Sequence, residues 1–121
     1  MSRAGARIAV SGGSAARSFL RAELGDVRFV TLASGEDAGA AVRDADMLVF
    51  VADQHEAPDG PRIAALAEAA RTRGILVAAL VVAGEPGSGP SALLAAFRDA
   101  ADMVMVLREA ADVQAVVAAL R

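Results

Sequence analysis

The residues best suited to chemistry lie in one short segment, Asp53-Gln54-His55-Glu56-Ala57-Pro58-Asp59-Gly60. It contains three carboxylates and His55, which is the only histidine in the chain. Carboxylate oxygens are suitable ligands for a divalent cation, and a histidine beside carboxylates can supply an acid and a base. The segment is short, contains a proline and directly follows an apolar run, so a solvated loop tip explains the same residues more simply. We therefore expect neither a metal site nor catalytic residues here.

A second candidate is the loop Gly12-Gly13-Ser14, which is separated from the apolar run Arg7–Val10 by Ser11 alone. Backbone N–H groups at the start of a helix attract anions such as phosphate. However, the G-x-G-x-x-G spacing of dinucleotide-binding loops is not met, and no acid ends the next apolar run, Val27–Leu32, to bind a ribose hydroxyl. These residues favour a tight turn. The segment Gly84–Pro90, with three glycines and two prolines, fits a mobile binding loop and a permissive connection equally well.

Several residue types are missing, and their absence excludes whole classes of site. The chain has no cysteine, which excludes disulfides, thiolate zinc sites and cysteine nucleophiles. All twelve cationic side chains are arginine, which excludes a Schiff-base lysine and the lysine of a Walker A loop. The net charge is −3 without a basic block, so we expect no nucleic-acid partner. We also expect no cofactor.

The hydropathy pattern contains no segment typical of a membrane protein. The strongly apolar run Gly74–Gly84 is only about half as long as a helix that spans a bilayer. The first ten residues, MSRAGARIAV, contain no apolar stretch long enough for a signal peptide. We therefore expect a soluble, cytoplasmic protein that makes no membrane contact.

Short apolar runs alternate with amphipathic segments along the chain, whose 121 residues are 55% apolar. The length and the absence of a dividing linker indicate one domain covering residues 1–121. Each apolar run has the length of a strand, and the segment after it has the spacing of a helix. We predict strands at Arg7–Val10, Val27–Leu32, Met47–Ala52, Ile75–Val82 and Met103–Leu107. We predict the helices that follow them at Ser14–Leu24, Ser34–Ala45, Gly60–Gly74, Ser91–Ala100 and Ala110–Leu120.

Five strands that each lead into a helix imply an α/β fold in three layers, with a doubly wound, five-stranded parallel sheet covered by helices on both faces. One helix fills the connection between the second and third strands, so we predict the strand order 2-1-3-4-5. In such sheets, ligands bind beyond the carboxyl ends of the strands. The helix after the third strand should bury the residues Ile63, Leu66, Ala67 and Ala70.

The final predicted helix, Ala110–Leu120, has an unusual outward face. Its inward positions are expected to be Val113, Val116, Val117 and Leu120. Its outward positions are the alanines Ala111, Ala115, Ala118 and Ala119, where a solvated helix would normally carry long polar side chains. Small side chains allow another helix to approach closely, which predicts an interaction face. The alternative is that the alanine-rich composition of the chain simply extends to its surface.

Four segments carry a resemblance to a known family. Arg7–Leu20 has the form of an opening strand, a loop and a helix, and Val30–Ala38 contains a second strand end followed by Ala-Ser-Gly-Glu. Asp46–Asp53 is an apolar strand that ends in an aspartate, and Pro58-Asp59-Gly60 follows it. In these motifs, and in length, essentially the whole chain resembles a response-regulator receiver (CheY-like) domain. The resemblance implies a flavodoxin-like fold.

The same resemblance implies a phosphorylation site that has lost most of its parts. In receivers an acid pair holds Mg²⁺, and that pair falls here on Gly12 and Gly13. The sensing hydroxyl falls on Val82 or Ala83, and the sensing lysine falls on Leu107 or Arg108. The phosphoacceptor position, Asp53, keeps its carboxylate. The implied vestigial pocket consists of Gly12, Gly13, Ser14, Asp53, Val82 and Arg108.

A receiver without these groups would be a pseudo-receiver, which is a non-catalytic signalling or regulatory module that acts by protein–protein interaction. Receivers commonly dimerise through their fourth helix, fifth strand and fifth helix. The resemblance therefore implies a protein partner, with a homodimer through the last helix as one form of it.

A second resemblance indicates a different class of protein. The stretch from Ala45-Asp46-Met47 to Gly74-Ile75-Leu76, together with Ala101–Val106, is similar to the bacterial tubulin homologue FtsZ. The glycine-rich phosphate signature of that family falls on His55–Pro61, which does not form such a cradle. The alternative function is therefore a degenerate FtsZ/tubulin-like or Rossmann-like nucleotide-binding domain.

Overall fold

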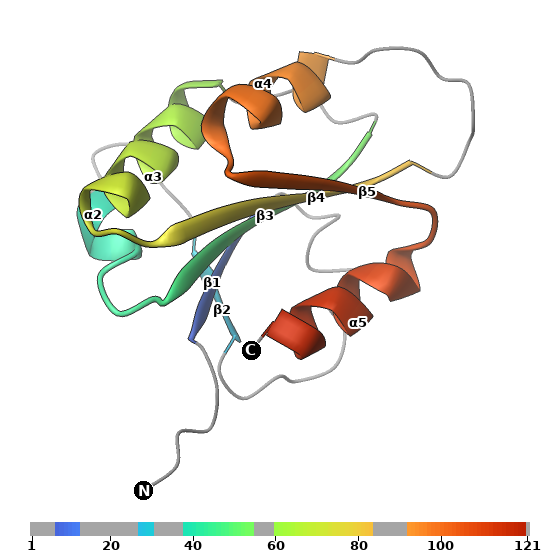
Figure 1. Ribbon diagram of the computed structural model, residues 1–121, viewed down its shortest axis with the longest axis horizontal. Helices are drawn as coiled ribbons and strands as arrows, with labels where there is room; N and C mark the ends of the chain where they lie inside the picture. The colour runs from blue at the N-terminus through green and yellow to red at the C-terminus, as the bar shows by residue number, and fades with distance from the viewer. Residues whose placement is uncertain (1–6, 13–26, 31–37, 55–59, 84–91, 121) are drawn as a thin grey trace, which may run out of the picture.

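The computed structural model describes residues 7–12, 27–30, 38–54, 60–83 and 92–120. Within these residues there is one parallel sheet, with strand order β2-β1-β3-β4-β5 (Figure 1). Its strands are β1 (Ile8–Ser11), β2 (Val27–Val30), β3 (Met47–Asp53), β4 (Leu76–Val82) and β5 (Met103–Leu107). Helices pack against this sheet, so the predicted α/β class with a parallel sheet is confirmed.

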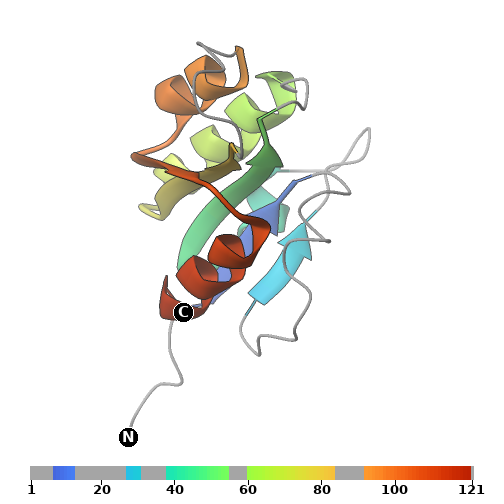
Figure 2. The same cartoon turned by 90° about the vertical axis from the view of Figure 1, so that its right-hand side faces the viewer.

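The described helices cover the two faces of the sheet unequally. One face carries α2 (Ala38–Ala41), α3 (Gly60–Thr72) and α4 (Ala92–Ala100), and we call it the three-helix face (Figure 1). The opposite face carries α5 (Ala110–Leu120), and we call it the α5 face (Figure 2). None of the helices within the described ranges is long and apolar enough to cross a bilayer.

The central strand β3 is buried on both faces because helices cover a parallel sheet from both sides. Leu48 and Phe50 belong to the core under the three-helix face, whereas Val49 and Val51 belong to the core under α5. Phe50 also stacks on Phe97 of α4, with 5.4 Å between the ring centroids. The uninterrupted apolar run in the sequence is therefore explained by burial on two sides.

Helix α3 buries the side that its sequence periodicity predicts, consisting of Ile63, Leu66, Ala67 and Ala70. The helix ends in a Schellman motif, in which Gly74 adopts a φ of +72° that favours glycine. The N–H of Gly74 donates to the carbonyl of Arg71 at 3.0 Å, and the N–H of Ile75 donates to the carbonyl of Ala70 at 2.8 Å. This turn directs the chain from α3 into β4.

Strands β3 and β5 are both preceded by Ala-Asp and begin with Met, and the two aspartates make the same kind of contact. The N–H of Val77 donates to Oδ2 of Asp102 at 2.9 Å, and the N–H of Asp102 donates to the carbonyl of Val77 at 2.8 Å. Asp46 and Arg7 form the same reciprocal pair, at 2.9 and 2.8 Å. We call these contacts the aspartate bridges. They join the start of β5 to β4 and the start of β3 to the residue before β1.

The structure differs from the sequence-based predictions mainly at the ends of elements. Ser11 is the last residue of β1 rather than part of the following turn, and β4 begins one residue later than predicted, at Leu76. Of the helix predicted at Ser34–Ala45, the described part is Ala38–Ala41, which a turn follows. The helix predicted at Ser14–Leu24 lies outside the described residues. Two positions of the last helix that were predicted to face inward, Val116 and Leu120, are half-buried and pack against the core under α5.

Candidate functional site

The carboxyl ends of three neighbouring strands form a level row. Asp53 at the end of β3 pairs with Val82 at the end of β4, and Val82 pairs with Leu107 at the end of β5. The N–H of Gln54 donates to the carbonyl of Val82 at 2.9 Å, which extends the β3–β4 pairing one residue further. Arg108 directly follows Leu107, so the structure brings Asp53, Val82 and Arg108 to one edge of the sheet.

Strand β1 ends before it reaches the level of this row. Ser11, its last residue, pairs with Phe50, so β3 extends three residues beyond it. Gly12 follows Ser11 and therefore lies below the level of Asp53. Gly13 and Ser14 lie outside the described residues, as do residues 55–59 with His55 and the segment 84–91.

The side chains of the row offer little chemistry. Asp53 is half-buried, Val82 is buried and apolar, and Arg108 is exposed. The strands that carry Asp53 and Arg108 are separated by β4, so two strand spacings, or about 10 Å, lie between these positions. Among the described residues, no group of three or more His, Cys, Asp or Glu side chains is placed to hold a metal ion. A carboxylate and a guanidinium on either side of an apolar strand end can bind a polar ligand, but they do not form a metal site.

Ser11 has a feature that the sequence interpretation missed. Its side chain is 1% exposed, and within the described part of the chain its Oγ has no hydrogen-bond partner. By the alternation of the strand, Ser11 lies on the same side as Ala9, toward the three-helix face. A buried hydroxyl without a partner is unfavourable, and such groups are few in folded proteins. A serine that ends an apolar run was the available sequence signal.

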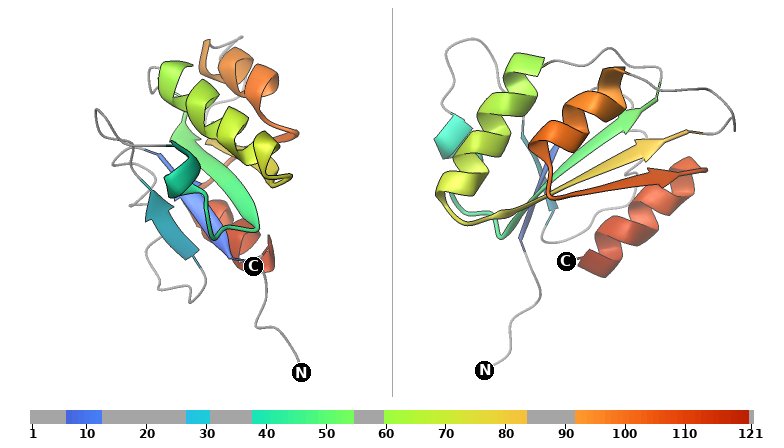
Figure 3. Two further views of the ribbon diagram at one scale, coloured as in Figure 1. Left: turned by 90° about the vertical axis from the view of Figure 1, so that its left-hand side faces the viewer. Right: turned by 45° about the horizontal axis from the view of Figure 1, so that its top comes forward.

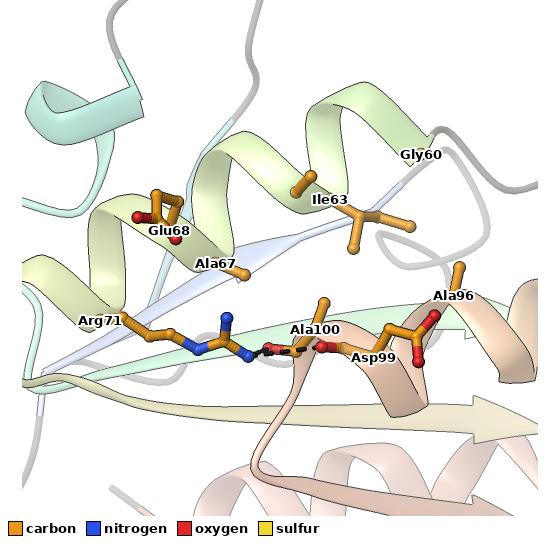
Figure 4. Close-up of a pocket in the computed structure, with 9 residues that line it drawn as sticks. Gly60, Ile63, Ala67, Glu68, Arg71, Ala96, Asp99 and Ala100 are labelled. Atoms are coloured by element: carbon orange, nitrogen blue, oxygen red, sulfur yellow. Dashed lines mark hydrogen bonds between the residues drawn. The ribbon is translucent and has the colours of Figure 1, made fainter.

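A groove between α3 and α4 was also missed by the sequence interpretation. Its volume is about 340 Å³, and Figure 4 shows that side chains of both helices line it. The lining consists of Gly60, Ile63, Ala64, Ala67, Glu68, Arg71, Ala96, Asp99 and Ala100. Four of these residues are alanines, whose side chains are too short to fill the space between two packed helices. The groove is therefore a consequence of the alanine-rich helices.

One end of this groove is occupied by the side chain of Arg71. Its Nη2 donates to the carbonyl of Ala100 at 3.0 Å and lies 3.4 Å from the carbonyl of Asp99 (Figure 4). The guanidinium thus satisfies carbonyls at the end of α4 that the helix itself leaves without a donor. The carboxylates of Glu68 and Asp99 project from the two facing helices and complete the polar rim (Figure 4). Apart from these two carboxylates and Arg71, the lining consists of glycine, alanine and isoleucine, so the groove offers an apolar lining with a charged rim.

The predicted interaction face on α5 is largely solvent-exposed. Ala111, Ala115 and Ala119 are exposed, and Ala118 is half-buried. On the opposite side of the helix, Val113 and Val117 are fully buried against the sheet.

Comparison with protein-family models and with curated proteins gives no match for this chain.

Proposed function

We propose that this protein is a non-catalytic pseudo-receiver, a signalling or regulatory module with a receiver-like (flavodoxin-like) fold that acts by binding another protein. The observation that carries the proposal is the composition of the carboxyl-edge row. Asp53 has the position of a phosphoacceptor at the end of a central strand, but Ser11 and Gly12 at the end of β1 have no carboxylate.

The loss of phosphorylation follows from what phosphoryl transfer requires. The reaction depends on a metal ion that neutralises the developing charge, and on groups that position the phosphoryl oxygens. Val82, next to Asp53 in the row, has no hydroxyl. Arg108 keeps a positive charge, but β4 lies between it and Asp53. These residues support a role without chemistry, in which the fold presents a surface to a partner.

The first test is phosphorylation itself. The protein is incubated with a small phosphodonor and Mg²⁺, and its intact mass is measured beside that of Asp53→Asn. We expect no change in mass for either chain, because the described residues beside Asp53 include no second acid to hold the metal. A gain of one phosphoryl group in the wild type that is lost in Asp53→Asn would overturn the proposal.

A thermal-shift measurement separates this proposal from the nucleotide-binding alternative. A ligand present at a hundred times its dissociation constant stabilises a protein by about 2.7 kcal/mol, which shifts the melting temperature clearly. We expect no shift with GTP, with NAD(P), or with Mg²⁺ and beryllofluoride. A shift with GTP or NAD(P) would favour the nucleotide-binding domain instead.

The partner surface that we propose includes the exposed alanines of α5. Sedimentation velocity compares the wild type with Ala115→Arg, in which a long charged side chain blocks close helix approach. Ala65→Arg is the matched control, because Ala65 is an exposed alanine on α3 outside the groove. Dimers that Ala115→Arg removes and Ala65→Arg keeps would support this face. Three indistinguishable monomers would show that this face does not bind a second copy.

A further inference from the structure

The groove between α3 and α4 has the size and lining of a site for a small organic molecule. The two helices lie side by side over the same face of the sheet (Figure 3). The residues of α3 that line the groove recur every three or four positions from Gly60 to Arg71, so they form one stripe along the helix. Its volume of about 340 Å³ lies within the range of small-molecule sites, which is roughly 300–1,000 Å³.

The rim of this groove carries one carboxylate from each helix. Glu68 of α3 and Asp99 of α4 are both exposed and both line the groove. Within the described part of the chain, the hydrogen bonds of these two residues use their backbone groups, and neither carboxylate has a hydrogen bond or an ion pair. Both carboxylates are therefore available to a cation that enters the groove.

The cationic side chain in the lining, Arg71, balances only part of this negative charge. Its guanidinium lies at one end of the groove, where Nη2 donates to the carbonyl of Ala100 at 3.0 Å (Figure 4). The lining contains two carboxylates and one guanidinium, so one negative charge is left unbalanced. Asp99 also lies in the last turn of α4, where the helix dipole favours a positive charge. The electrostatics of the groove therefore favour a ligand with a single positive charge.

The apolar part of the lining favours an organic cation over a metal ion. Ile63, Ala67 and Ala100 line the groove and are almost fully buried, at 2%, 2% and 8% exposed. A hydrated ion would gain nothing from these side chains, whereas an apolar ligand body that contacts them removes apolar surface from water. Among the described residues, no group of three or more side chains is placed to ligate a metal.

We propose that the groove between α3 and α4 binds a small organic cation, namely a primary amine with an aromatic or branched alkyl body. The body contacts Ile63, Ala67 and Ala100, and the ammonium group lies at the rim in the negative field of Glu68 and Asp99. This site goes beyond the protein-binding function proposed above and does not depend on it.

A set of matched compounds tests the class of ligand. The probe is phenethylamine, which is protonated at neutral pH, and NMR follows the backbone amide signals of the labelled protein as it is added. We expect saturable shifts in α3 and α4 with a dissociation constant of about 1–10 mM, which is usual for a ligand of this size. Phenylacetate reverses the charge, phenethyl alcohol removes it, and ethylamine removes the ring. Each should bind at least about threefold more weakly than phenethylamine.

Three results of this titration would contradict the proposal. The first is the absence of saturable shifts with phenethylamine. The second is a set of shifts that lies outside α3 and α4, which would mean adventitious binding elsewhere on the protein. The third is binding of phenylacetate that is as tight as that of phenethylamine, because the carboxylates at the rim would then play no part.

Filling the groove tests the location of the site. Ala64 lines the groove, and its neighbour Ala65 lies outside the lining, although both are exposed alanines of α3. Ala64→Leu places a larger side chain in the space for the ligand body, so it should weaken phenethylamine binding at least about tenfold. Ala65→Leu is the matched control and should leave binding unchanged. Equal binding by the two variants would overturn the proposal.

Removing single charges tests the role of the rim. Glu68→Gln and Asp99→Asn keep the size of the side chain, and each should weaken phenethylamine binding by about two- to fivefold, as is usual for an exposed ion pair. Asp44→Asn removes the same charge from an exposed acid outside the groove, so it should leave binding unchanged. The same loss in all three variants would mean that only the net charge of the protein matters, and would overturn the proposal.

The outcomes also separate this site from the function proposed above. Phosphorylation of Asp53 would overturn the pseudo-receiver function and leave the amine site standing. Failure of phenethylamine to bind would overturn the amine site and leave the pseudo-receiver function standing. If a variant is unfolded by circular dichroism, the titration of the wild-type chain with the four compounds still decides the question.

Discussion

Strands β4 and β5 are neighbours with nearly the same composition but very different surroundings. Both are uncharged and made almost entirely of aliphatic side chains, Leu-Val-Ala-Ala-Leu-Val-Val and Met-Val-Met-Val-Leu. Six of the seven residues of β4 are buried, whereas none of the five residues of β5 is. The difference arises because β4 has a strand on each side and β5 has one neighbour. The hydrophobicity of a strand therefore does not show whether it lies at the centre or the edge of a sheet.

The largest difference between the two strands should appear when a core side chain is removed. Leu80 of β4 is fully buried in the α5 core. We expect Leu80→Ala to lower the free energy of unfolding by about 2–5 kcal/mol, from lost burial and the cavity that remains. Urea denaturation followed by circular dichroism measures this change. A loss below 1 kcal/mol would mean that the core collapses around the site or that β4 is less enclosed than described.

An intermediate effect is expected at the aspartate bridge that joins the two strands. Asp102→Ala leaves the partly buried N–H of Val77 without its acceptor, which should cost about 1–3 kcal/mol of unfolding free energy. Asp102→Asn keeps an oxygen in place and should cost less. Asp46→Ala removes the equivalent bond to Arg7, which is exposed, and should also cost less. Equal losses for Asp102→Ala and Asp46→Ala would show that burial of the bond does not matter. All three variants are measured by urea denaturation.

The smallest effect is expected at the exposed edge. Val106 of β5 is 55% exposed, so Val106→Ala should change the unfolding free energy of the monomer by less than about 0.5 kcal/mol. Urea denaturation followed by circular dichroism measures this change. A large loss of monomer stability would contradict the contrast between the two strands.

The sequence was a good guide where local pattern determines structure and a poor one where tertiary contacts do. The parallel α/β class and the buried side of α3 follow from periodicity, and the structure confirms both. The exposure of β5 does not follow from its hydrophobicity. It depends on which strands become neighbours, and only the predicted strand order 2-1-3-4-5 indicated an edge position. The groove between α3 and α4 depends on the distance between two helices, and the position of Arg71 depends on the end of a helix 28 residues away.

In the candidate site, too, some residues could be placed from local sequence pattern and others could not. Its positions Asp53, Val82 and Arg108 lie at the ends of strands, so the pattern of apolar runs places them at one edge. The point at which β1 ends relative to β3, and the burial of the Ser11 hydroxyl, depend on the register between the two strands. The apolar run of a single strand does not reveal that register. The predicted members Gly13 and Ser14 lie outside the described residues.

The two aspartate bridges have a consequence for how the sheet withstands sliding. Each bridge holds its strand with a side chain and a backbone group at once, so the strand cannot move along its neighbour without breaking both bonds. A slip of one residue would turn every side chain of that strand to the opposite face. For β5 this would exchange the residues that face α4 with those that face α5. The bridge at Asp102 thus holds the register of β5 against β4, and with it the face of the sheet to which each side chain of β5 points.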